Sequence, residues 1–320
     1  MADFTAARRI ALVLPKRLGD SLIMMPLANS LRREGRAITV FSDRISDLTR
    51  WFPGFDIRAV PAPEQAPAAF ADYEVVAQMY ADRPLAAPAA QDGRFSCFDD
   101  WRVAATKRPA SGRENLRVYQ FGAYAAEVFG IRSRDIDNGS RPPEGLRYRR
   151  HGERVIIHPT AGNPRGYWPR EKYARLAAAL VARGFVPQFV VEPWERADWL
   201  GQGNAYPFQF VETASLGELA DYIHESGWFI GSDSGVGHLA SSCRISTLTI
   251  CERPRNMRGW LPAWSPAAYV RPIWLPTSGL RNRFWREATP VWRVLRAFDA
   301  LRTGGTHASG RHPVHGAAAG

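Results

Sequence analysis

Short apolar runs, each followed by a stretch with apolar residues three or four positions apart, recur along the chain. In the first half, the runs at 10–14, 37–41 and 73–78 predict buried strands, and the stretches at 20–34, 45–51 and 115–129 predict helices. This succession is typical of a doubly wound parallel sheet. Between residues 81 and 113 the pattern is lost, and many prolines, alanines, glycines and arginines predict a long irregular loop with a function.

The second half repeats the pattern after a polar, charged segment at 132–154, which predicts a linker. Strands are predicted at 154–158, 187–191, 228–231 and 247–250, and helices at 170–183, 215–223, 237–242 and 291–301. The sequence therefore predicts an α/β protein with one domain at 1–150 and another at 151–302. The small, polar residues 303–320 predict a disordered tail.

Composition narrows the function classes. The net charge of +11 favours anionic partners, although an arginine-rich codon usage explains it equally well, since all but three of the 42 basic residues are arginine. No helix-turn-helix, zinc-finger or RNA-recognition signature is present, so we expect no nucleic acid partner. The three cysteines lack metal-site spacing and predict buried thiols. Without a long apolar run or a signal-peptide core, we expect a cytoplasmic protein.

Two predicted strands end in small residues and lead directly into a helix. The sequence GSDSGVGHLA at 231–240 follows one strand, and PKRLGDS at 15–21 follows another. The first N–H groups of a helix have no partner within the helix, so such a turn binds phosphate readily. The two turns predict two similar domains that face one cleft.

Three segments carry a family resemblance. These are RLGDSLIMMPLANSLR at 17–32, VIIHPTAG at 155–162 with YWPREKY at 167–173, and IGSDSGVGHLAS at 230–241. In this order they resemble glycosyltransferase family 9, the bacterial ADP-heptose:lipopolysaccharide heptosyltransferases. The resemblance implies a GT-B fold, with two Rossmann-like doubly wound domains facing an interdomain cleft. It also implies an inverting transfer that needs neither a metal nor another cofactor.

The resemblance assigns the catalytic role to Asp20. An inverting transferase needs a base that takes the proton of the acceptor hydroxyl. The alternative is that Asp20 only caps the helix. Gly19 would allow close backbone approach or simply form the turn. Lys16 and Arg17 would contact acidic groups of the acceptor or the donor diphosphate, or remain solvated surface charges.

The turn at 231–240 is the predicted diphosphate site. Backbone N–H groups of Ser234 and Gly235 would hold the diphosphate together with the helix dipole. His238 would donate to a phosphate or sugar oxygen. Asp233 would repel a diphosphate, so we expect it to orient the loop or to bind a sugar hydroxyl.

Further donor contacts follow from the neighbouring strands. Thr160 would form part of the pocket wall, and Glu192 and Glu195 would bind ribose hydroxyls, unless they are ordinary surface glutamates. The family commonly has a phosphate-binding lysine two residues before its Trp-Pro pair, where this chain has Gly166. We expect Arg165 to supply that charge instead.

The acceptor is predicted to bind the N-terminal domain. The candidate residues for acceptor binding in its predicted loop are Arg102, Lys107, Arg108 and Arg113. We expect a heptosyltransferase that uses ADP-heptose and a lipopolysaccharide core or other surface glycan, with weak contact to the inner face of the inner membrane. Two alternatives remain open. One is a protein O-heptosyltransferase or a transferase for another nucleotide sugar, which the altered 251–260 segment favours. The other is a degenerate GT-B protein that binds nucleotide or glycan without catalysis.

Overall fold

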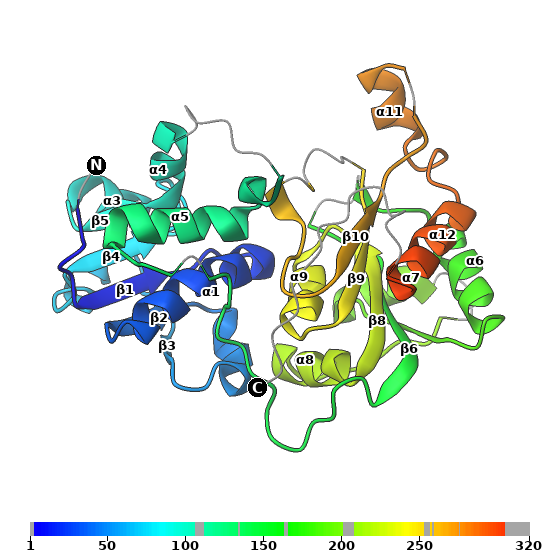
Figure 1. Cartoon of the computed structure of the whole chain (residues 1–320), viewed down its shortest axis with the longest axis horizontal. Coiled ribbons are helices and arrows are strands. Elements are labelled where there is room, and N and C mark those ends of the chain that lie inside the picture. The colour runs from blue at the N-terminus through cyan, green and yellow to red at the C-terminus, as the bar shows by residue number, and fades with distance from the viewer. Residues whose placement is uncertain are drawn as a thin grey trace. The chain divides into compact units, whose positions relative to one another are not determined.

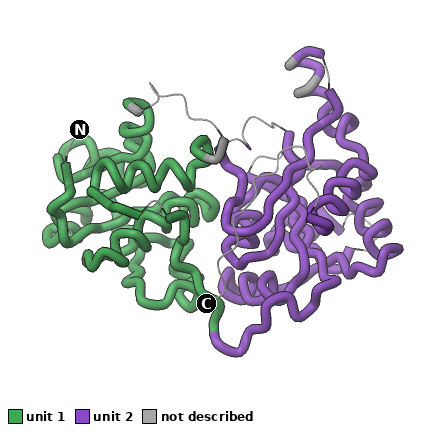
Figure 2. The backbone as a smooth tube through the Cα atoms, in the orientation of Figure 1, with its two compact units in different colours: residues 1–143 green, residues 144–320 purple. Residues whose placement is uncertain are grey.

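A computed structural model describes residues 3–105, 112–133, 135–162, 166–200, 208–252, 257, 259–274 and 276–304. The chain divides into two compact units, residues 1–143 and 144–320 (Figure 2). The division lies within the segment 132–154 that the sequence predicted as a linker. The predicted tail at 303–320 lies, from residue 305 onward, outside the described residues.

The first unit contains a five-stranded parallel sheet in the order β3-β2-β1-β4-β5 (Figure 1). The strands are β1 (Arg9–Val13), β2 (Ala37–Phe41), β3 (Asp56–Arg58), β4 (Val75–Gln78) and β5 (Phe95–Cys97). The helices are α1 (Leu18–Arg33), α2 (Ala66–Ala69), α3 (Ala86–Gln91), α4 (Phe98–Ala105) and α5 (Arg117–Phe129), with 3-10 turns η1 (Ile45–Trp51) and η2 (Gly112–Asn115).

The expectation of one irregular loop at 81–113 was wrong. This stretch contains α3, the edge strand β5 and α4. The two helices are only six and eight residues long, and β5 only three, which is too short for a clear apolar period. Their proline and alanine content hid elements that pairing with β4 and packing against α5 stabilise.

Burial explains why the central elements of the first unit form. The run from Ile10 to Val13 is fully buried because β1 lies between β2 and β4 in the sheet. Helix α1 packs between this sheet and α5, and most of its residues are buried. Helix α5 ends at Gly130, whose φ of 67° is the left-handed conformation that glycine adopts without a steric penalty.

The second unit contains another five-stranded parallel sheet, in the order β10-β9-β8-β6-β7. The strands are β6 (His151–His158), β7 (Val186–Phe189), β8 (Ser226–Ser232), β9 (Ser246–Ile250) and β10 (Ala267–Val270). The helices are α6 (Arg170–Val181), α7 (Pro193–Leu200), α8 (Leu216–His224), α9 (Gly235–Ser242), α11 (Ser278–Phe284) and α12 (Val291–Arg302). Figure 1 shows α6 and α12 on one face of the sheet and α8 and α9 on the other.

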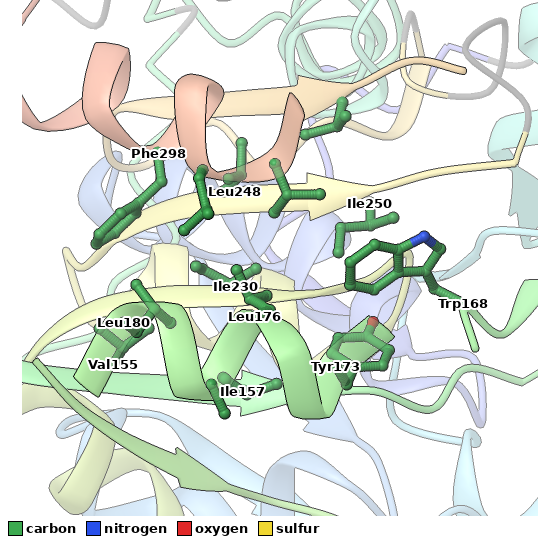
Figure 3. Close-up of a cluster of buried hydrophobic side chains, with 14 of the residues drawn as sticks. Val155, Ile157, Trp168, Tyr173, Leu176, Leu180, Ile230, Leu248, Ile250 and Phe298 are labelled. Carbon is green, nitrogen blue, oxygen red and sulfur yellow. The ribbon is translucent and has the colours of Figure 1, made fainter. Parts of the chain in front are cut away.

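The core between the second sheet and helices α6 and α12 is shown in Figure 3. Aliphatic residues of three parallel strands meet aliphatic residues of α6, and Trp168 and Tyr173 cover the end of this layer. The Trp168 ring nitrogen donates to the carbonyl of Thr289 at 2.8 Å, so its one polar group is paired within the core. This core holds strands β6 and β8 in place, and the predicted donor residues Thr160 and Ser234 follow these strands.

Each sheet has one place where the order of its strands reverses. In the first unit this place lies between β1 and β4, and in the second between β6 and β8. Ligands of doubly wound folds bind outside the carboxyl ends of the strands at such a point. Of the candidate residues, Asp20 follows β1, Thr160 follows β6, and the turn at 233–238 follows β8. Among the described helices, none is both long and apolar enough to cross a membrane.

Candidate functional site

Asp20 lies at the reversal point of the first sheet, in the first turn of α1, which follows β1. The N-cap residue of α1 is Arg17, and its side chain makes no capping bond. The Asp20 carboxylate instead accepts a hydrogen bond from the Tyr80 hydroxyl at 3.1 Å, and Tyr80 follows β4. This bond links the segments that follow β1 and β4, the two strands on either side of the reversal point. Asp20 is therefore not the N-cap residue of α1.

Burial dominates the acid–base properties of this pair. It raises the pKa of Asp20 above its usual value, although the Tyr80 hydrogen bond opposes the shift. Burial also raises the pKa of Tyr80, and the nearby Asp20 charge raises it further. Tyr80 thus stays protonated and donates, while a raised pKa makes the Asp20 carboxylate a stronger proton acceptor.

Positive side chains surround the pair. Arg17 and Arg83 both lower the pKa of Asp20 by their charge, and Arg83 stacks on the Tyr80 ring at 4.0 Å from its centroid. Arg102 forms an ion pair with Asp99 at 2.9 Å. Each of these interactions brings a cation toward the base, as an anionic acceptor would require.

Arg117 extends this positive region. Burial lowers the pKa of Arg117, and the neighbouring charge of Arg102 lowers it further, so the two guanidinium groups lie close enough to repel each other. Bringing a second anion between such groups would relieve the repulsion. Of the predicted acceptor residues, the structure thus brings Arg17 and Arg102 near the base.

The roles of the other predicted acceptor residues stay predictions. Lys16 is exposed. Lys107 and Arg108 lie outside the described residues, as does the side chain of Arg113. Gly19 is buried in the first turn of α1. Its predicted role in backbone approach stays a prediction.

The reversal point of the second sheet carries the start of α9. Ser234 is the N-cap residue of this helix, with extended backbone angles and no side-chain capping bond. Its hydroxyl oxygen is buried and has no hydrogen-bond partner among the described residues. An unpaired buried hydroxyl costs free energy unless a ligand pairs with it, so this atom marks a polar binding position.

His238 lies one turn further along α9. The side chain is almost fully buried, and within the described part of the chain its Nδ1 atom has no hydrogen-bond partner. Burial lowers the pKa of His238 to about 4, so the ring is neutral near pH 7. It can therefore donate one hydrogen bond to an oxygen of a ligand, but it does not supply a positive charge.

Close packing fixes the strand that leads into α9. A Cβ atom at Gly231 would lie 2.6 Å from the carbonyl oxygen of His158 on β6. The following Ser232 hydroxyl donates to the carbonyl of Pro159 at 2.8 Å. Only a glycine fits this approach, and it holds the turn at 233–235 against the end of β6.

Asp233 and Gly235 complete this turn. Asp233 is exposed, and its negative charge raises the pKa of Cys251 somewhat, although burial is the main cause of that shift. Gly235 is the first residue of α9. The predicted roles of both in donor binding stay predictions.

Glu195 joins the two loops beside this turn. One carboxylate oxygen accepts from the Thr160 hydroxyl at 2.9 Å, and the other from the Tyr167 hydroxyl at 3.1 Å. The backbone N–H of Glu192 also donates to Glu195, at 3.2 Å. Glu195 thus clamps the loop after β6 to the start of α7, a structural task that the sequence did not predict. Its predicted contact with ribose, and that of the exposed Glu192, stay predictions.

The sequence missed several neighbours of the base. Tyr80, Arg83 and Asp99 all lie near Asp20, as their effects on its pKa show. Arg117 lies near Tyr80 and Asp99. A usable signal was present, because Tyr80 comes directly after a predicted strand and the carboxyl ends of parallel strands meet at one edge. The predicted phosphate ligand Arg165 lies outside the described residues.

Comparisons with known proteins agree with the motifs. Residues 132–264 match the profile described as glycosyltransferase family 9 (heptosyltransferase). This stretch contains two of the three resembling segments and confirms the predicted family there, and with it the expectation of a glycosyltransferase. A comparison with curated protein sequences gave no match.

Solved structures show the same fold. The chain is similar to a family 9 glycosyl transferase from Veillonella parvula, with 16% identity, a TM-score of 0.68, and 93% of this chain and 98% of that chain covered. It is also similar to the E. coli ADP-heptose LPS heptosyltransferase II, with 16% identity, a TM-score of 0.64, and 92% and 99% covered. The E. coli heptosyltransferase WaaC with ADP gives 14% identity, a TM-score of 0.62, and 92% and 99% covered. The predicted GT-B fold of two Rossmann-like units is confirmed.

Proposed function

We propose that this chain, whose residues 132–264 form a glycosyltransferase family 9 domain, transfers heptose from ADP-heptose to a lipopolysaccharide core or another anionic surface glycan. The observation that carries the donor part is the start of α9. There the buried Ser234 hydroxyl and His238 Nδ1 both have no hydrogen-bond partner among the residues that the structure describes. A diphosphate at this helix N-terminus would satisfy both atoms and interact favourably with the helix dipole.

The reaction assigns one task to each unit. The Asp20 carboxylate takes the proton of the acceptor hydroxyl, and the oxygen forms a bond to the anomeric carbon from the side opposite the diphosphate. The bond to the diphosphate breaks, ADP leaves with the electron pair, and the anomeric configuration inverts. Helix α9 stabilises the charge that develops on the leaving diphosphate, which is the electrostatic task that a metal performs elsewhere.

The acceptor is bound through its negative charges. Arg17 and Arg83 lie near the base, and Arg102 and Arg117 lie near its neighbour Asp99. These four charges support an anionic acceptor over a neutral one. Such acceptors are assembled at a lipid surface. We therefore include weak contact with the inner face of the inner membrane in the proposal, and a cytoplasmic location with it.

Thermal unfolding with ADP, UDP, GDP, CDP and dTDP, each with and without EDTA, tests the donor. A nucleotide at ~100 times its Kd should stabilise the fold by about 2.7 kcal/mol. We expect a shift with ADP that EDTA leaves unchanged. A shift with another nucleotide would replace the donor, loss of the shift in EDTA would require a metal, and no shift with any nucleotide or with ADP-heptose would refute the donor site.

A further inference from the structure

An exposed apolar and basic surface lies in the second unit, in a segment that none of the predicted site residues belongs to. The segment 271–296 contains six arginines and one acidic residue, Glu287. It also exposes five large apolar side chains: Ile273, Trp274, Leu280, Phe284 and Trp292. Among the described residues, half of the large exposed apolar side chains thus come from this short segment.

The base of the segment is firmly held to the unit. The Ile273 N–H donates to the carbonyl of Ala288 at 2.6 Å, and the Arg293 side chain donates to the carbonyl of Arg271 at 2.8 Å. Trp285 is buried in the core of the unit. Between these anchors α11 stands away from the sheet of the second unit, as Figure 1 shows. The segment is therefore an anchored projection.

The exposed side chains are too large to be incidental. Trp274 is 76% exposed, just beyond the Ile273–Ala288 bond, and Trp292 is 55% exposed on α12. Trp292 and the exposed Arg296 are four residues apart and lie on the same face of α12. Apolar and cationic groups are thus presented together.

We propose that the 271–296 segment docks the protein on an anionic lipid bilayer, with Trp274 and Trp292 at the headgroup level and the exposed arginines on lipid phosphates. Among the described side chains these are Arg271, Arg283 and Arg296. Tryptophan prefers the membrane–water interface, and a basic side chain near an anionic surface strengthens binding. A nucleic acid would pair with the arginines but would leave Ile273 and Leu280 in water. A second copy would bring two arginine-rich surfaces together, which would repel each other.

This inference rests on the membrane contact of the proposed function and specifies where it occurs. Co-sedimentation of the full chain with vesicles tests it, using phosphatidylcholine alone and phosphatidylcholine mixed with phosphatidylglycerol. We expect binding to the anionic vesicles only, and weaker binding at high salt. No binding to anionic vesicles, or equal binding to neutral ones, would overturn the proposal.

Paired variants locate the surface. The double variant Trp274→Ser, Trp292→Ser should lose most vesicle binding, whereas the control Trp194→Ser removes a tryptophan that is 73% exposed on α7 and should bind normally. Arg296→Gln should weaken vesicle binding about fivefold, because a basic side chain near an anionic surface contributes about 1 kcal/mol. The control Arg44→Gln removes an exposed arginine of the first unit and should weaken vesicle binding much less. Equal effects of variant and control would reduce the contact to general attraction by net charge and overturn the proposal.

Two further measurements separate the possible failures. Light scattering reports the oligomeric state, and a change in the double variant without lost vesicle binding would assign the surface to a second copy and overturn the proposal. The nucleotide-induced thermal shift should be the same in the double variant and the wild type. A shift that persists while vesicle binding is absent in the wild type would refute the docking surface and leave the donor assignment intact.

Discussion

The reversal points of the two sheets use the same topology for opposite chemistry. In the first unit the strands β1 and β4 deliver a carboxylate that is already paired with a tyrosine hydroxyl and surrounded by arginines. In the second unit β8 leads into small residues, and a buried hydroxyl and a buried ring nitrogen there have no partner in the described structure. The paired group suits proton transfer at a fixed position, and the unpaired atoms suit a ligand that arrives with its own oxygens. Two units of the same fold thus carry different groups: the first carries the base and the second carries the predicted anion site.

Replacing the base tests the first half of this comparison most severely. Asp20→Asn should lower kcat roughly a hundredfold to ten-thousandfold, because general base catalysis contributes about that much. The variant should unfold at an equal or higher temperature at neutral pH. Burial raises the pKa of Asp20, so its ionised form destabilises the folded chain above the usual carboxylate pKa, and a neutral amide removes that cost.

Two controls accompany Asp20→Asn. Asp82→Asn removes an exposed carboxylate that pairs with Arg83, and it should change the rate little. The nucleotide-induced thermal shift should persist in Asp20→Asn, because the donor residues lie on the second sheet. If Asp20→Asn kept a rate within tenfold of the wild type, the base would have to lie elsewhere.

Removing an unpaired atom tests the second half. Ser234→Ala should weaken nucleotide binding roughly tenfold to hundredfold, because a hydrogen bond to a charged group contributes about 1.5–3 kcal/mol. The stability of the free protein should not fall, since the Ser234 hydroxyl has no partner to lose. Titration calorimetry with ADP and thermal unfolding measure the two effects.

Thr247 offers a matched control for Ser234. Its hydroxyl is also buried without a partner, but it lies on β9 and in no predicted site. Thr247→Val should leave the nucleotide affinity unchanged and should not lower stability. Equal nucleotide affinities in both variants and the wild type would remove Ser234 from the donor site.

A gain of charge sharpens the same site. Gly166 occupies the position at which the family commonly has a phosphate-binding lysine, and a Cβ atom there would meet no atom of the described residues within 4 Å. Gly166→Lys should therefore fold normally and tighten ADP binding by up to about fivefold, the contribution of an exposed ion pair. Gly166→Gln has similar length without the charge and should leave the affinity unchanged. Tighter binding in both variants would rule out the charge as the cause.

Much of this comparison could be predicted from the sequence. Asp20 and the turn at 231–240 follow long apolar runs, so their place at the carboxyl ends of strands was clear from local patterns. Tyr80 was not found, because its contact with Asp20 joins residues sixty positions apart through two strands. The sequence also could not show whether Glu195 holds two loops together or binds the ligand. Its partners Thr160 and Tyr167 lie in another loop, and only the folded chain brings them together.

The smallest expected effect concerns the hydrogen bond that the sequence missed. Tyr80→Phe removes the donor that lowers the pKa of Asp20, so the pKa of this carboxyl should rise further. Because the base must be ionised, kcat/KM falls as the pH drops through this pKa, and the acidic limb of the profile should move to higher pH. The rate on the alkaline plateau should change little. Tyr73→Phe, at the start of the same segment, should leave the profile in place.

The direction of the shift distinguishes positioning from packing. If Tyr80 only filled space, Phe would keep its ring under Arg83 and the acidic limb would not move. If the limb moved to lower pH, the hydrogen bond would have to favour the protonated acid, and Asp20 would be the donor of the pair. A shift to higher pH with an unchanged plateau therefore shows that the first unit tunes its base through Tyr80. The second unit has no equivalent of this pair at His238, whose Nδ1 is without a partner in the described structure.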